Sequence, residues 1–181
     1  MTADSSFILS QQRQDGNIPL FLALENGNHG VCRELLHVLP KEQINMHRPA
    51  TGDTGIHIGM RKKDIDMLRL MVDNGGDVDQ QNVRADLLKE VHCYLLIFPF
   101  SLQNEGQTAL HMAAIMGDEQ FIKFLHMVGA KPNIQDKLER TPLHLATENG
   151  HMKTVDFLTE KFRASVHERT KVCFDLDGVI D

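Results

Sequence analysis

The sequence of 181 residues predicts an all-α array of stacked helix pairs, and three observations carry this prediction. The first is that one short motif recurs along the chain. The second is that its two clearest copies begin at Gln107 and Arg140. The third is that the apolar residues after each copy are spaced as on a helix. A single unit of this size cannot bury an apolar face, so the stacking of neighbouring units provides the core. With no Trp and a single Tyr, that core must consist of Leu, Ile, Val, Met and Ala.

The motif is clearest at 140–146, which reads RTPLHLA and is followed by Gly150. A second copy, QTALHMAA, occupies 107–114 and is followed by Gly117. Weaker copies are DTGIHIG at 53–59 and NIPLFLA at 17–23.

The four copies are unevenly spaced. In chain order, their leucine-type positions are Leu20, Ile56, Leu110 and Leu143. The step from Ile56 to Leu110 is much longer than the other two, which indicates extra sequence between the second copy and the third.

Each residue of the best copy suits the start or the end of a helix. Thr141 has a hydroxyl that can accept from free backbone amides at a helix N-terminus, and Pro142 suits the first helical position. Gly150 can adopt the left-handed conformation that ends the helix. A second helix is expected over about 151–161, with its buried side formed by Val155, Phe157 and Leu158.

These residues resemble the ankyrin repeat, which combines the pattern T-P-L-H-x-A, a glycine after the first helix and a period of about 33 residues. The resemblance covers roughly 15–170 and implies a solenoid of helix–turn–helix units with β-turn connectors. Three positions depart from the pattern: Gly59 replaces the usual Ala, Lys63 replaces the glycine after the first helix, and Phe21 replaces the His.

The repeat pattern divides the chain into seven segments. They are an N-terminal tail at 1–14, a divergent repeat 1 at 15–50, repeat 2 at 51–82, an insertion at 83–103, repeat 3 at 104–136, repeat 4 at 137–171 and a non-repeat tail at 172–181. Without the insertion, the step from Ile56 to Leu110 becomes equal to the step from Leu110 to Leu143.

The insertion has the form of a translated intron. Val83-Arg84 can be encoded by GTA-AGA, and 98–103 by a pyrimidine-rich tract that ends in CAG. We therefore predict an unspliced intron of 63 nucleotides, three for each inserted residue, with a functional binding loop as the alternative. Val172 also allows a GT start where the repeat pattern ends. Sequencing of the mature transcript decides between the two.

Longer stretches are similar to the first ankyrin repeats of TRPN channels, the "no mechanoreceptor potential" branch of the transient receptor potential family. They are GNIPL at 16–20, VCRELL at 31–36, GDT at 52–54, RKKDIDM at 61–67, DKLERTP at 136–142 and KFRASVHERTK at 161–171. The resemblance implies a fragment of a mechanosensitive cation channel whose cytoplasmic ankyrin array is an elastic tether to a cytoskeletal partner. A free-standing ankyrin adaptor or scaffold protein is the alternative.

Composition excludes several classes of function. A net charge of −6 argues against a nucleic-acid partner, which requires clustered Lys and Arg. Cys32, Cys93 and Cys173 are too far apart to suggest a zinc site or a disulfide framework. The N-terminus lacks the pattern of a signal peptide. The longest apolar run, Tyr94–Phe100, falls far short of the roughly 20 residues that span a bilayer. We expect a cytoplasmic chain that crosses no membrane.

No enzyme, cofactor or metal site is expected. His57, His111 and His144 occupy one repeat position, which indicates a structural role. Asp175 and Asp177 resemble the first motif of haloacid-dehalogenase-type phosphatases, but the other parts of such a site are missing from this sequence. No glycine-rich phosphate loop or small-molecule site is indicated.

The remaining candidate is a protein-interaction surface. Ankyrin arrays usually meet their partners through connector tips and exposed positions of the first helix, and the alternative for each residue is a merely solvated position. By repeat position, the resemblance implies a surface formed by Asn104, Glu105, Gln107, Ile115, Met116, Lys137, Leu138, Arg140, Glu148 and Asn149.

Overall fold

The described residues are built mainly of helix pairs. The computed structural model describes residues 18–49, 51–83 and 106–168. The chain divides into two compact units, Met1–Glu90 and Val91–Asp181. All regular elements of the described residues are helices, as the sequence predicts. The insertion at 83–103, apart from Val83, and the tails at 1–14 and 172–181 lie outside the described residues.

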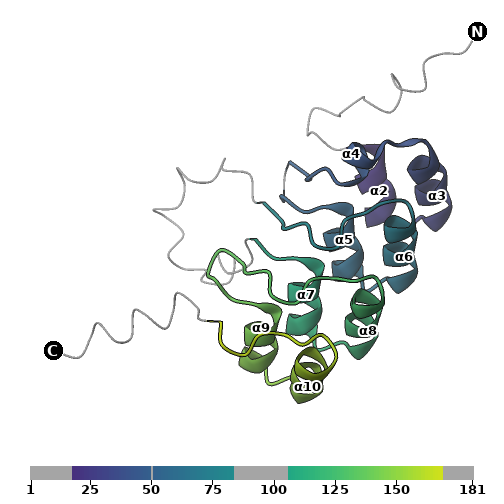
Figure 1. Ribbon diagram of the computed structural model, residues 1–181. Helices are drawn as coiled ribbons and strands as arrows, with labels where there is room; N and C mark the ends of the chain where they lie inside the picture. The colour runs from purple at the N-terminus through teal and green to yellow at the C-terminus, as the bar shows by residue number, and fades with distance from the viewer. Residues whose placement is uncertain (1–17, 50, 84–105, 169–181) are drawn as a thin grey trace, which may run out of the picture. The chain divides into compact units, whose positions relative to one another are not determined.

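The first unit contains two helix pairs and one extra helical turn. The first pair is α2 (Pro19–Glu25) with α3 (His29–Val38), and the second is α5 (Gly55–Lys62) with α6 (Ile65–Asp73). Helix α2 contacts α3 and α5, and α3 contacts α6, so the first helices and the second helices form two adjacent rows (Figure 1).

The extra turn is α4 (Lys41–Ile44), which the repeat pattern does not predict. It lies between the two pairs in the chain and buries Ile44, which is 1% exposed. It lies between Leu20 and Ile56, whose step is slightly longer than the step from Leu110 to Leu143.

The second unit also contains two helix pairs. They are α7 (Ala109–Met116) with α8 (Glu119–Met127), and α9 (Pro142–Glu148) with α10 (Met152–Glu160). Helix α7 packs on α8 and α9, and α10 packs on α9 and α8. The predicted roles of Thr141, Pro142 and Gly150 are confirmed, because Thr141 is the N-cap, Pro142 begins α9 and Gly150 has a φ of +72°.

The buried side of α10 differs in part from the prediction. Leu158 is fully buried, but Val155 and Phe157 are only half-buried. Thr154 is buried instead, at 3% exposed. Residues four apart lie on one helix face, so the stripe that packs against its neighbours is centred on Thr154 and Leu158. Phe157 instead makes edge contacts with the rings of His126 and Phe162, at centroid distances of 5.7 and 6.1 Å.

The three departures from the repeat pattern have local explanations. A Cβ on Gly59 would lie 3.0 Å from Leu68 Cδ2, so the larger Leu68 side chain occupies the space of a methyl group. Lys63 has a φ of 54° and takes the left-handed position at which Gly117 and Gly150 stand in other repeats. Phe21 is 1% exposed and fills with a ring the place that a histidine occupies elsewhere.

Candidate protein-interaction surface

A threonine–histidine pair begins the first helix in three of the four repeats, and in repeat 3 its histidine also bonds to the connector that follows. The backbone N–H of Thr108 donates to Nδ1 of His111 at 3.1 Å, and the Thr108 hydroxyl lies 2.8 Å from the same nitrogen. Thr54 with His57 and Thr141 with His144 form the same capping box. Since Nδ1 accepts, the ring hydrogen belongs on Nε2, which lies 3.0 Å from the carbonyl oxygen of Arg140 in the next repeat. The predicted structural role of these histidines is confirmed.

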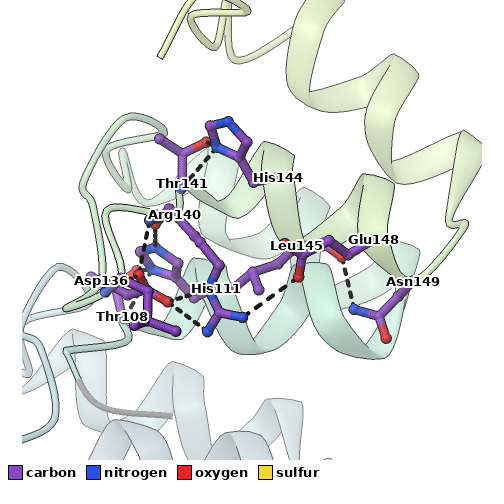
Figure 2. Close-up of polar contacts among 10 residues, drawn as sticks. Thr108, His111, Asp136, Arg140, Thr141, His144, Leu145, Glu148 and Asn149 are labelled. Atoms are coloured by element: carbon purple, nitrogen blue, oxygen red, sulfur yellow. Dashed lines mark hydrogen bonds and ion pairs between the residues drawn. The ribbon is translucent and has the colours of Figure 1, made fainter. Parts of the chain in front are cut away.

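Arg140 belongs to the connector's internal support rather than to its exposed surface. Its Nε donates to Oδ2 of Asp136 at 2.9 Å, and its backbone N–H donates to Oδ1 at 2.9 Å (Figure 2). A further guanidinium nitrogen lies 3.5 Å from a carboxylate oxygen of Glu148. Arg140 is 6% exposed, so the prediction of an exposed contact residue is wrong there. The arginine is buried because it joins the connector to the end of α9.

Gln107 is also buried, at 3% exposed, and the prediction of its exposure is wrong for a similar reason. It directly precedes the capping Thr108, the repeat position that Asp53 and Arg140 occupy in repeats 2 and 4. Those two residues are 3% and 6% exposed. The position before the capping threonine therefore faces the interior in each of these three repeats.

The other predicted surface residues divide into three groups. Lys137 in the connector and Glu148 and Asn149 at the C-terminal end of α9 are exposed, and these three residues are named here the connector surface. Asn149 also donates from Nδ2 to the Leu145 carbonyl oxygen at 2.8 Å, which closes the end of α9. The half-buried residues are Ile115, Met116 and Leu138, and the residues outside the described part are Asn104 and Glu105.

Two ion pairs that the sequence did not reveal lie at equivalent positions of repeats 2 and 4. The acidic and the basic residue have exchanged places between them. In repeat 4 the buried Arg140 reaches the exposed Glu148, eight residues later. In repeat 2 the buried Asp53 pairs with Arg61, also eight residues later. The shared spacing of eight residues was the available signal, but it means nothing until the helix brings the two positions together.

The described residues hold no cluster of three or more His, Cys, Asp or Glu side chains placed to bind a metal ion. Within the same ranges, no helix has the length and apolar character needed to span a bilayer. Asp175 and Asp177 lie outside the described residues.

Comparison with known proteins identifies the repeat. A family model for ankyrin repeats, in three copies, matches residues 86–170. The Notch-regulated ankyrin repeat-containing protein of Xenopus laevis is 33% identical over 98 residues, which cover 51% of this chain and 86% of that protein. This chain belongs to the ankyrin-repeat family. Its helix pairs are ankyrin repeats, and it is an ankyrin protein-interaction domain.

Two longer relatives show how far the similarity of the ankyrin region extends. The probable 26S proteasome regulatory subunit p28 of Saccharomyces cerevisiae is 25% identical over 164 residues, or 91% of this chain and 64% of that protein. A transient receptor potential cation channel subfamily A member 1 homolog of Caenorhabditis elegans is 24% identical over 159 residues, or 79% of this chain. The chain spans 13% of the channel homolog, so these relatives are longer proteins of which it matches a part.

Proposed function

We propose that this ankyrin domain is a segment of the cytoplasmic tether of a TRPN-like mechanosensitive cation channel. The residue stretches similar to TRPN repeats support this proposal, and so does the similarity to a channel of the wider family. On this proposal the domain lies on the cytosolic side of the membrane and binds a cytoskeletal protein. Elastic extension of stacked repeats would carry force from that protein towards the pore.

The observation that carries the binding role is the connector surface. Lys137, Glu148 and Asn149 are exposed, while the neighbouring Arg140 and Thr141 are used in holding the connector. Replacement of all three surface residues by Ala is expected to abolish proximity labelling of partner proteins in the native cell. The matched control is Ala at three residues exposed elsewhere on the same unit, Gln120, Lys131 and Lys153. Equal labelling by the two variants would remove the connector surface from the proposal.

The channel assignment is tested on the gene. An open frame that continues beyond residue 181 with further repeat units of the same length and then six apolar stretches supports the tether. A stop codon directly after a few more repeats supports the second candidate, a free-standing ankyrin adaptor. The similarity to p28 over 91% of the chain favours that alternative, because p28 is not named as a channel.

The proposal includes no catalysis, cofactor, metal, nucleic acid or small-molecule substrate. The Asp175–Asp177 motif is the one feature of the sequence that suggests an enzyme, and a single pair of carboxylates cannot hold a phosphoryl group in line. We expect no Mg²⁺-dependent hydrolysis of a phosphate monoester. Hydrolysis that the substitution Asp175→Asn removes would overturn this part of the proposal.

A further inference from the structure

A hollow of about 360 Å³ lies between the second helices of the first unit. Helices α3 and α6 contact each other, and both contribute residues to its lining. Five of its six lining residues are charged or titratable. The lining residues are His29 and Arg33 from α3, and Asp66, Arg69, Leu70 and Asp73 from α6.

Three of these charges have no partner among the residues that the structure describes. His29 lies one turn before Arg33 on α3. Its Nε2 lies 2.7 Å from Oδ2 of Asp64 in the next repeat. Within the described ranges, Arg33, Asp66 and Asp73 form no ion pair. All three side chains are exposed. The hollow therefore offers one cation and two anions to an outside group.

The equivalent place in the second unit is arranged differently. The counterparts of His29 and Arg33 are Glu119 and Lys123, which pair with each other at 3.3 Å along α8. Lys123 thus satisfies its charge on its own helix, whereas Arg33 cannot, because His29 is not an anion and is engaged elsewhere. Lys123 in the second unit is therefore a control position for Arg33 in the first unit.

The charges of Arg33, Asp66 and Asp73 alternate along the hollow. Asp66 and Asp73 are seven residues apart on α6, or about 10.5 Å at a rise of about 1.5 Å per residue. Arg33 occupies the same repeat position on α3 that Arg69 occupies on α6, so it stands level with a point between the two aspartates. The order of charge along the hollow is negative, positive, negative.

A partner that complements this order needs two cations about 10.5 Å apart with an anion between them. An α-helix places side chains at i, i+3 or i+4, and i+7 on one face at this spacing. An extended strand covers the same length in about three residues, and side chains three apart on a strand point to opposite faces. The geometry therefore favours a helix.

We propose that this hollow docks a helical segment of a partner protein with Lys or Arg at i and i+7 and Glu or Asp at i+3 or i+4. The inference rests on the proposed protein-binding function and names a second surface for it, in the first unit. The basic residues meet Asp66 and Asp73, and the acidic residue meets Arg33. Leu70 contacts the apolar stems of these side chains. Because the pairs are exposed, salt weakens the binding.

The test uses helical Ala/Gln-based peptides of about 20 residues, long enough to form a helix in water. One carries Lys, Glu and Lys at i, i+4 and i+7, and a permuted peptide carries Lys, Lys and Glu at the same positions. Binding to the full chain is measured by fluorescence anisotropy at low ionic strength and at about 0.15 M salt. The first peptide is expected to bind at least about threefold more tightly, and to lose that preference as salt rises.

Variants of the protein assign the preference to the hollow. Arg33→Glu and Asp73→Lys are each expected to remove the preference for the first peptide, and Arg33→Gln serves where a reversal disturbs folding as seen by circular dichroism. The control, Lys123→Glu, should leave the preference unchanged. Equal binding of the two peptides, no binding of either, or an equal effect of Lys123→Glu would overturn the proposal. The labelling test on the connector surface is independent of all these outcomes, because its residues lie in the second unit.

Discussion

At the scale of single residues, the Thr–His pair explains why one short motif recurs. Thr108 and His111 are both fully buried, and each side chain accepts from the backbone N–H of the other at the start of α7. The ring then reaches the next repeat through Nε2. Repeat 1 lacks the pair: Ile18 stands at the N-cap with no side-chain hydrogen bond, and Phe21 replaces the histidine. An apolar contact substitutes there for a polar one.

We predict that Thr108→Ala lowers the free energy of unfolding by about 1–2 kcal/mol, because it removes a buried N-cap. Thr108→Ser keeps the hydroxyl and loses one methyl group, so it should retain most of the stability. Urea denaturation followed by circular dichroism measures both variants. If Ser and Ala proved equally destabilising, the methyl group and not the cap would be the source of the effect.

Cys32 predicts a dependence of stability on alkaline pH. Burial, and secondarily the negative charge of Asp64, raises the pKa of this thiol from 9.0 to about 11. The protonated thiol is thus favoured in the folded state, and its contribution is fully present below pH 9.0 and is lost as the pH rises towards 11. We expect the free energy of unfolding to fall by about 1 kcal/mol between pH 8 and pH 10 through this group.

The measurement compares urea midpoints across this range for a chain with Ser at Cys93 and Cys173, with and without Cys32→Ala. The alanine variant should lack the part of the alkaline loss that the thiol causes. Parallel curves for the two chains would show that Cys32 does not titrate differently in the folded and unfolded states. Alkylation of the native thiol at pH 8 should also be slow, since the thiolate is the reactive form.

At the scale of elements, the turn between the two helices of a pair decides how closely neighbouring repeats approach. Gly117 has a φ of +64°, and a Cβ there would lie 2.5 Å from Nδ1 of His151 in the next repeat. That ring also places Nε2 at 2.8 Å from the Ile115 carbonyl oxygen. Because Gly117 has no side chain, the ring of His151 can approach and form a hydrogen bond with the Ile115 carbonyl at the end of α7.

The same turn position supports two opposite substitutions. Gly117→Ala should destabilise the chain by about 1–2 kcal/mol from the left-handed conformation alone, with the clash against His151 in addition. Lys63→Gly, at a φ of 54°, should stabilise it by about 1 kcal/mol, because glycine adopts that conformation without strain. Thermal unfolding of the two variants tests the pair. A destabilised Lys63→Gly would mean that the lysine side chain contributes more than its backbone strain costs.

At the scale of the whole molecule, repeat proteins are stabilised by the contacts between neighbouring units. In repeat 4, Val155, Phe157 and Phe162 remain half-buried, and Met152 and Val166 are 68% and 61% exposed. The rings of Phe162 and His126 meet at a centroid distance of 4.8 Å and cover part of this apolar surface. This apolar surface is suited to the packing of a further repeat, because neighbouring units stabilise one another.

We therefore predict that residues 1–181 on their own are marginally stable and prone to aggregation, and that an additional repeat stabilises them. Fusion of one further repeat unit after residue 171 should raise the denaturant midpoint and reduce aggregation, whereas a Gly/Ser linker of equal length should change neither. Equal midpoints for the two fusions would show that repeat 4 already ends in a finished face.

The sequence by itself was sufficient for the helix pairs, their caps and the family. These features depend on local chemistry that repeats along the chain. Thr141 and Pro142 favour the start of a helix and Gly150 favours its end through local backbone and capping preferences, without tertiary contacts. The fold could therefore be predicted before any contact was known. The extra turn α4 was not predicted, because it has no counterpart in the repeat motif.

The candidate surface depended on the tertiary structure. Arg140 and Glu148 look equally exposed in sequence, but only packing shows that Arg140 turns inward to Asp136 and leaves Glu148 at the surface. The charges that line the hollow likewise form one site only because α3 lies against α6. Burial and charge pairing are properties of neighbours that lie far apart in the chain. A repeat motif predicts which helices form, and the packing of those helices decides which side chains remain available to a partner.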